Sequence, residues 1–286
     1  MSFDKWYEVV KTHLGNHKKE KLRISEKGTF RGKDYDHILP IRNGERNYMC
    51  RAAETALDPQ ERHSYWHHLN SSQTLCVNYF APLDHKKLGF LLSRLLNKTV
   101  EPRTSKFEYN PDPKGSHFDF FAEDKDKNRY FFEIKYTEND VTKNSKASNP
   151  SAIYKTLYAE DVGANPAFAN VDEDSFMNRH FQAYRNMVKG VDCCYSVFIT
   201  MRSNENTRTE LESALRDLGS VTKDHVILLY WEEVIDTALC TFKEDPDLVQ
   251  YYEEMKNKYL PVFDKDHTRC LCDLCRKRHE GLLFNN

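Results

Sequence analysis

The sequence predicts a mixed α/β fold, in which a central sheet of parallel and antiparallel strands is flanked by helices. Its segments follow the order α-β-β-β-α-β-α-β-α, which is typical of such layered domains. Two strands are joined only by the polar turn "DKDKN", so they should pair as a hairpin, and the later strands are short apolar runs. With 286 residues, 39% of them hydrophobic, the chain can bury this core without disulfides.

The compact body begins with a helix and then becomes rich in strands. Asp84 is placed to cap a helix over 85–97, where leucines recur at helical spacing and should enter the core. The strand segments are aromatic or β-branched and are bounded by polar turns. They are 106–109, 116–123, 129–136, 194–201 and 225–231.

Helices are expected between and after the later strands. One helix is predicted over 173–189, and a second over 207–218, where Thr207 and Glu210 stand at capping-box spacing. Helical segments then continue to about residue 258. The mostly polar stretch 137–170 predicts a long loop, and loops of that length are usually functional or mobile.

Composition divides the chain into three parts. We expect a polar, partly helical extension over 1–70, the main core over 71–240, and a helix with a tail rich in cysteine and histidine over 241–286. The formal net charge is −2, which excludes a globally basic protein but not a local basic groove. Without a signal sequence or a long apolar run, the protein is expected to be cytoplasmic, reduced and free of the membrane.

One predicted strand, "YFFEIKYTE" at 130–138, carries charges among its aromatics. Side chains alternate along a strand, so Glu133 and Lys135 share the face opposite Tyr130 and Phe132. The preceding strand of the hairpin can bring Asp119 beside Glu133. Glu108 stands between two aromatics in the strand before that and should also point away from them, which would gather three carboxylates and a lysine.

Carboxylates gathered in this way are oxygen ligands of the kind that Mg²⁺ or Mn²⁺ accepts, with water and phosphate completing the shell. Such a metal activates water and polarises a phosphate oxygen, and a neighbouring lysine can orient the water and stabilise developing charge. An exposed ion pair on an amphipathic strand is the alternative. The aspartate upstream and the order of the elements favour the catalytic interpretation.

These residues resemble the D…(D/E)-x-K signature of the PD-(D/E)XK nuclease superfamily. "FD" at 118–119 is followed after fourteen residues by "EIK" at 133–135, with Phe118 standing where the superfamily name has proline. The predicted order is similar to its restriction-endonuclease-like core, α-β-β-β-α-β. Segments within about residues 65–200, such as "HHLNSSQTLCVNYFAPL" and "HFQAYRN", resemble a bacterial family described as restriction endonucleases.

The resemblance implies roles for four residues of this chain. Asp119 and Glu133 would bind the metal ion, Lys135 would serve the attacking water, and Glu108 would be an accessory acid. Nuclease relatives often carry a glutamine on the helix after the hairpin, which makes Gln182 the candidate here. Glu138 matches the family pattern, but no physical role for it follows from the sequence.

Two further groups of polar residues are candidate DNA contacts. Arg185 and Lys189 fall on the same face of the 173–189 helix as Gln182, where they could bind phosphate; a solvated helix face is the alternative. Ser71, Ser72 and Gln73 could contact phosphate or base edges. Ser72 could equally cap the helix that begins there.

The C-terminal tail suggests a structural zinc site. Its Cys/His cluster has four candidate ligands, of which the C-x2-C pair has a usual spacing: Cys270, Cys272, Cys275 and His279. His267 or Cys50 could replace His279 as the fourth ligand. Neighbouring arginines and lysines would give such a knuckle affinity for phosphate, and a frayed tail with unpaired thiols is the alternative.

The sequence therefore predicts a metal-dependent endonuclease that acts on DNA, of restriction or defence type. A nucleic-acid-binding module without catalysis and a repair or recombination nuclease acting on ends or branches are the alternatives. RNA as substrate and the recognition sequence stay open. Two cuts on a duplex favour two active sites, so a homodimer is compatible with this function.

Overall fold

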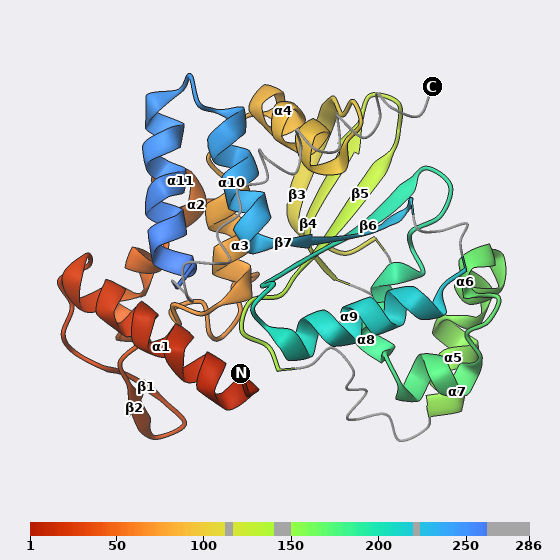
Figure 1. Cartoon of the computed structure of the whole chain (residues 1–286), viewed down its shortest axis with the longest axis horizontal. Helices are drawn as coiled ribbons and strands as arrows, with labels where there is room; N and C mark the ends of the chain where they lie inside the picture. The colour runs from red at the N-terminus through yellow and green to blue at the C-terminus, as the bar shows by residue number, and fades with distance from the viewer. Residues whose placement is uncertain (112–116, 140–149, 220–223, 262–286) are drawn as a thin grey trace.

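The structure, a computed structural model, describes residues 1–111, 117–139, 150–219 and 224–261 (Figure 1). Its centre is a five-stranded sheet of order β3-β4-β5-β6-β7. The strands are β3 (Pro102–Tyr109), β4 (Phe118–Asp124), β5 (Arg129–Ile134), β6 (Cys194–Thr200) and β7 (Val226–Tyr230). β3, β4 and β5 pair antiparallel, and β5, β6 and β7 pair parallel. The predicted mixed sheet flanked by helices is confirmed.

The predicted hairpin is β4–β5. Its turn is closed by the buried carboxylate of Asp124, which accepts hydrogen bonds from the backbone N–H groups of Asp126 and Asn128 and from the Tyr130 hydroxyl. A short turn closed in this way fixes the register of the two strands. Phe120 consequently pairs with Phe132.

One face of the sheet is covered by α3 (Ser72–Phe80), α4 (His85–Leu96), α10 (Trp231–Thr241) and α11 (Pro246–Tyr259). Asp84 accepts a 2.8 Å hydrogen bond from the Lys87 N–H and caps α4, as predicted. Phe80 of α3 stacks on Phe120 of β4 with ring centroids 4.1 Å apart. The predicted apolar face of β5 lies in this core, from Tyr130 to Tyr136.

The other face is covered by helices that connect the parallel strands (Figure 1). They are α5 (Pro150–Leu157), α6 (Ala159–Ala164), η2 (Pro166–Phe168), α7 (Glu173–Asn178), α8 (Phe181–Met187) and α9 (Glu205–Asp217). The loop predicted over 137–170 was therefore wrong for Pro150–Leu157 and Ala159–Ala164, which are helical. Residues 140–149 lie outside the described part. Buried apolar side chains, such as Phe168 against Tyr184, explain why these segments fold.

Two predicted helices differ in detail from the structure. The helix expected over 173–189 is broken at His180, whose backbone is not helical, and the break gathers Arg179, His180 and Tyr184 around Asp217. The helix α9 begins at Glu205 because Asn204 caps it, accepting a hydrogen bond from the Thr207 N–H. The Thr207 hydroxyl instead donates to the Glu138 carbonyl.

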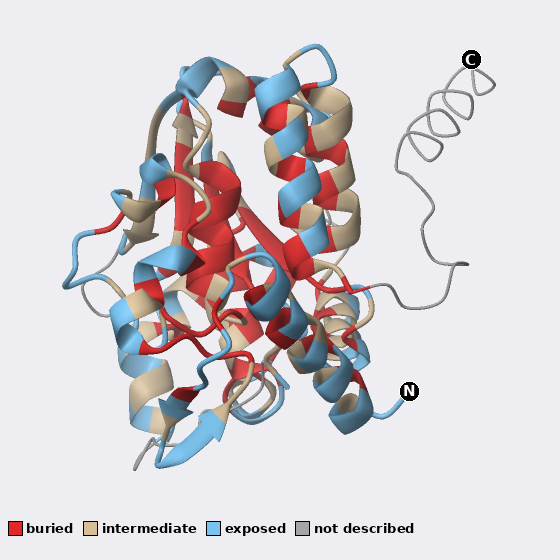
Figure 2. Ribbon diagram, turned by 90° about the vertical axis from the view of Figure 1, so that its left-hand side faces the viewer, coloured by how far each residue is buried: buried red, intermediate tan, exposed pale blue. Residues whose placement is uncertain are grey.

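The N-terminal part packs onto the same core. It contains α1 (Phe3–Glu20), the hairpin of β1 (Gly28–Phe30) and β2 (Lys33–Tyr35), η1 (Ile41–Asn47) and α2 (Arg51–Glu54). α1 contacts α11, and one buried cluster runs from Trp6 to Tyr259. Figure 2 shows that burial is concentrated in the sheet and the inward faces of the helices. Within the described residues, no helix is long and apolar enough to cross a membrane.

A buried polar network joins α11 to the segment before α3. Lys258 is 1% exposed and donates to the backbone and side-chain oxygens of Asn47, at 2.5 and 3.0 Å. The Asn47 amide in turn donates to the carbonyls of Trp66 and His68, each at 2.8 Å. The end of α11 therefore fixes the backbone around residues 66–68.

We predict that Phe120→Ala lowers the free energy of unfolding by about 3–5 kcal/mol, because it empties the stacked core beneath α3. Phe90→Ala is the matched control, because Phe90 is 55% exposed and its loss should change stability by less than about 0.5 kcal/mol. Urea unfolding followed by circular dichroism measures both. Equal effects of the two variants would contradict the packing described.

Stability should depend on pH through Lys258. Burial lowers the pKa of its ammonium to about 7, whereas the unfolded chain keeps that proton up to about pH 10.4. Between these values the unfolded state binds more protons, so stability rises with pH. We predict that the free energy of unfolding of the wild type rises by about 2 kcal/mol relative to Lys258→Met between pH 7 and 9. Parallel pH profiles would contradict this.

Candidate active site

A cavity of about 440 Å³ lies beside the carboxyl-terminal end of β5, the central strand of the sheet. The lining comes from four places: the segment before α3 with the first residue of that helix, the end of β3 with the start of β4, the end of β5 with the residues that follow it, and α8. The residues are His63, Tyr65, His68, Asn70, Ser71, Ser72, Glu108, His117, Asp119, Glu133, Ile134, Lys135, Thr137, Glu138 and Arg185. The carboxyl ends of parallel strands are a common location of active sites in α/β proteins.

The hairpin register places Asp119 opposite Glu133, one step beyond the pair Phe120–Phe132. The carboxylate of Asp119 accepts a 2.6 Å hydrogen bond from the Ile134 N–H, which holds it against β5. Glu133 is only 8% exposed. The two carboxylates are therefore brought together on rigid strands.

Two side chains hold the Glu133 carboxylate. Lys135 Nζ lies 2.8 Å from Oε1, and the Asn186 amide of α8 donates to Oε2 at 2.7 Å. Arg185 Nε donates to Asn186 Oδ1 at 3.3 Å, which orients that amide. Asn186 was missed by the sequence analysis, although it lies one helical turn after Gln182, the glutamine chosen there.

Glu108 joins the pair from β3. The pairs Phe107–Phe120 and Tyr109–Phe118 put it level with Asp119. Its φ is +46°, a conformation that is uncommon for a side chain of this size and that clusters at functional sites. The Gln73 amide donates to one carboxylate oxygen at 2.8 Å, and His63 Nε2 lies 3.6 Å from the other.

Burial and crowding perturb the titration of these groups. Burial, and then the charges of Glu133 and Glu108, raise the pKa of the Asp119 carboxyl well above its usual range. Burial opposes the charge on Lys135, but the carboxylates of Glu133, Glu138 and Asp119 outweigh it and raise the pKa of the ammonium. The hydrogen bond with Glu108 raises the pKa of His63 despite partial burial.

Crowded carboxylate oxygens are donors that fit a hard divalent cation such as Mg²⁺ or Mn²⁺. In the described part of the chain, no group of three or more His, Cys, Asp or Glu side chains stands arranged to hold a metal ion. Lys135 and Asn186 occupy both oxygens of Glu133. The residues that would hold a metal ion are Asp119 and Glu133, and Glu108 lines the same cavity.

The candidate DNA contacts divide into two groups. Ser71, Ser72 and Arg185 line the cavity. The cap of α3 is Ser71, which accepts from the Thr74 N–H, so the assignment of Ser72 as the cap was wrong by one residue. Lys189 lies outside the lining and pairs with Asp161 at 2.5 Å.

Gln73 and Gln182 are not in the positions that the sequence analysis expected, which were a DNA contact for Gln73 and the active site for Gln182. Gln73 is 1% exposed, accepts from the His63 N–H and donates to the Glu61 carbonyl besides Glu108. The buried Gln73 side chain therefore holds the Glu108 carboxylate in place. Gln182 of α8 is half-buried and is not among the described residues that line the cavity.

The structure gives Glu138 a local role. Its carboxylate accepts a 2.6 Å hydrogen bond from the Tyr136 N–H, and its carbonyl accepts from Asn204 and Thr207. It thereby ties the chain leaving β5 to the start of α9. The proposed zinc ligands Cys270, Cys272, Cys275 and His279 lie outside the described residues.

The wall formed by residues 63–70 was also missed as a unit. It supplies His63, Tyr65, His68 and Asn70 to the cavity. The signals in the sequence are the concentration of histidine, aromatic and amide groups in "HSYWHHLN" and the family resemblance of "HHLNSSQTLCVNYFAPL", which includes His68 and Asn70. Such residue types occur equally in ordinary cores, and only the tertiary structure brings them beside the carboxylates.

Comparison with known proteins identifies the family. Residues 11–260 match the family described as restriction endonuclease associating with ARP. The match extends from α1 into the end of α11 and includes every described residue of the candidate site. No curated protein and no solved structure matches the chain. This match over most of the chain shows that the chain belongs to the family described as restriction endonuclease associating with ARP.

Proposed function

We propose that the protein is a metal-dependent endonuclease of restriction or defence type, which hydrolyses phosphodiester bonds in DNA. The observation that carries the proposal is the meeting of Asp119, Glu133 and Lys135 in one cavity. The match to a restriction endonuclease family supports DNA as the substrate. These residue types on rigid strands suit phosphoryl chemistry, in which the attack geometry is narrow.

The acidic residues would hold the metal ion. Asp119 and Glu133 would bind Mg²⁺ or Mn²⁺, which when bound supplies a polarising charge to the phosphate and lowers the pKa of water. Asn186 keeps the Glu133 carboxylate turned into the cavity. Gln73 and the His63 side chain do the same for Glu108, which would act as an accessory acid.

Lys135 would act on the attacking water and the phosphate. Its backbone N–H donates to the Ile199 carbonyl at 2.8 Å and its carbonyl accepts from the Trp231 indole at 3.1 Å, so the backbone beneath the ammonium is fixed on both sides. A positioned, charged ammonium can orient water and stabilise charge that develops on phosphate oxygens. Arg185, Ser71 and Ser72 would contact the DNA backbone.

The first test is cleavage of closed circular plasmid DNA in Mg²⁺. We predict that Lys135→Ala and Asp119→Asn each lower the cleavage rate by at least about 10²-fold, since each removes a group that acts at the reacting phosphate. Chelation of the metal should abolish cleavage by the wild type.

Lys256→Ala and Asp236→Asn are the matched controls. These residues form a 2.7 Å ion pair between α10 and α11, away from the cavity lining, so both variants should retain the wild-type rate. Normal activity in both active-site variants would contradict the assignment. Salt-sensitive DNA binding without product in the wild type would favour the non-catalytic alternative.

A second prediction separates Asn186 from Gln182. Asn186→Ala should raise the Mg²⁺ concentration needed for half-maximal cleavage by about 10–100-fold, because the Glu133 carboxylate loses the partner that orients it. Gln182→Ala should change that Mg²⁺ concentration less, because Asn186, and not Gln182, contacts Glu133. If the Mg²⁺ titration showed a larger effect for Gln182→Ala than for Asn186→Ala, Gln182 rather than Asn186 would be the helix residue that supports the metal site.

A further inference from the structure

One portion of the cavity wall contributes no residue to the proposed metal site. Tyr65, His68 and Asn70 all line the cavity and all come from the segment that precedes α3. The space of about 440 Å³ lies within the range of pockets that hold small ligands, so it has room for more than a phosphate and a metal ion.

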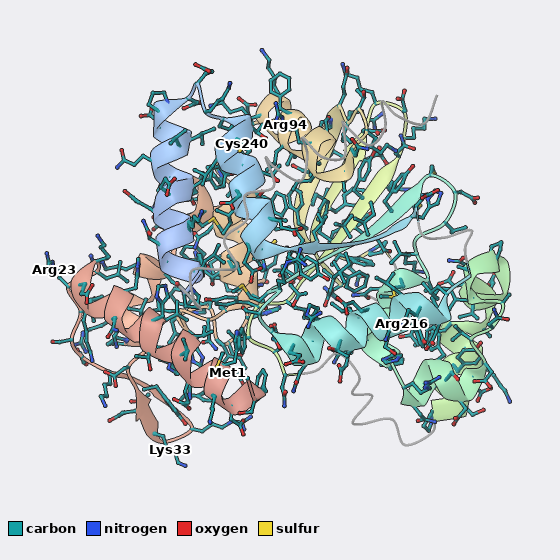
Figure 3. All side chains as sticks on the ribbon, in the orientation of Figure 1. Met1, Arg23, Lys33, Arg94, Arg216 and Cys240 are labelled. Atoms are coloured by element: carbon teal, nitrogen blue, oxygen red, sulfur yellow. The ribbon has the colours of Figure 1, made fainter. Side chains whose placement is uncertain are left out.

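Tyr65 presents an aromatic ring that is accessible but held in place. The residue is 46% exposed. Phe30 of β1 packs edge-on against it at 5.1 Å, and His68 packs at a tilt at 5.2 Å. The β1–β2 hairpin, which supplies Phe30, projects from the body with Lys33 at its tip (Figure 3). An exposed aromatic ring supported in this way is suited to stacking on another planar group.

Two polar atoms of the same cavity wall have no hydrogen-bond partner among the described residues. They are His68 Nε2 and Asn70 Oδ1, both buried. The Asn70 amide nitrogen is used, donating to Thr137 Oγ1 at 2.9 Å and to the Tyr7 hydroxyl at 3.3 Å. Unpaired buried polar atoms are rare in native proteins and call for an explanation. Partners supplied by a ligand would provide one.

The backbone of the segment that carries Tyr65, His68 and Asn70 is held by hydrogen bonds from earlier parts of the chain. The carbonyls of Trp66 and His68 accept from Asn47, and the Leu39 N–H donates to the His67 carbonyl at 3.2 Å. The His63 N–H donates to the Gln73 side chain at 2.8 Å, so the backbone is tied before and after Tyr65. Little ordering should therefore be needed when a ligand binds.

We propose that Tyr65, His68 and Asn70 form a subsite for an unpaired nucleobase next to the scissile phosphate. The base stacks on the Tyr65 ring, and its polar edge meets the side chains of Asn70 and His68. This inference rests on the proposed function, which supplies the nucleic acid. It deepens that function, because it requires the base beside the cut to be unstacked from a duplex or single-stranded.

The experiment measures binding of wild-type protein in EDTA, where the proposed cleavage does not occur. The probes are a fluorescently labelled single-stranded oligonucleotide of mixed sequence and an abasic oligomer of the same length. Anisotropy titrations give Kd for both. The wild type should bind the base-bearing strand about 10–100-fold more tightly than the abasic one, from stacking.

Tyr65→Ala should lose about 10–100-fold in affinity for the base-bearing strand and little for the abasic one. Tyr65→Phe keeps the ring and should bind like the wild type. Phe90→Ala removes another exposed aromatic, from α4, and should also bind like the wild type. Circular dichroism of each variant checks its fold.

Three results of the binding experiment would overturn the subsite: no binding of the single strand by the wild type, equal Kd values for Tyr65→Ala and Phe90→Ala, or an equal loss on the abasic oligomer. Plasmid cleavage in Mg²⁺ tests the proposed function separately. Base-dependent binding through Tyr65 without cleavage would keep the subsite and reject the nuclease. Cleavage without any dependence on Tyr65 would keep the nuclease and reject the subsite.

Discussion

The register of the β4–β5 hairpin is the constraint on which the site depends. The pair Phe120–Phe132 sets Asp119 opposite Glu133. A shift of one strand by one residue would turn its side chains over and leave the two carboxylates on opposite faces of the sheet. The register is held from below by the stack of Phe120 on Phe80 and at the turn by Asp124. Packing and turn geometry thus decide where the charges meet.

Gathering largely buried carboxylates on neighbouring strands is unfavourable unless each one has a partner. The fold supplies those partners from distant parts of the chain: Asn186 from α8 for Glu133, and Gln73 from α3 for Glu108. Lys135 offsets part of the negative charge. The arrangement suits the binding of a cation and a phosphate, for which oxygen donors and a positive charge must stand side by side.

The sequence was sufficient to predict the local features. Alternation placed Glu133 and Lys135 on one face of a strand, and the short polar turn predicted the hairpin that brings Asp119 to them. The helix capped by Asp84 followed from local chemistry as well. The break at His180 and the early start of α9 were not predicted, since contacts with Asp217 and the cap at Asn204 override the periodic pattern.

Strand alternation and spacing alone determined that this chain would bring an acidic pair and a lysine together on a mixed sheet. Only the tertiary structure decided what surrounds them. Asn186 and Gln73 become partners of the carboxylates, and Tyr65, His68 and Asn70 become a wall of the same cavity. The reason is physical: periodicity is a property of neighbours along the chain, whereas contacts between α3, α8 and the sheet depend on how separate elements pack.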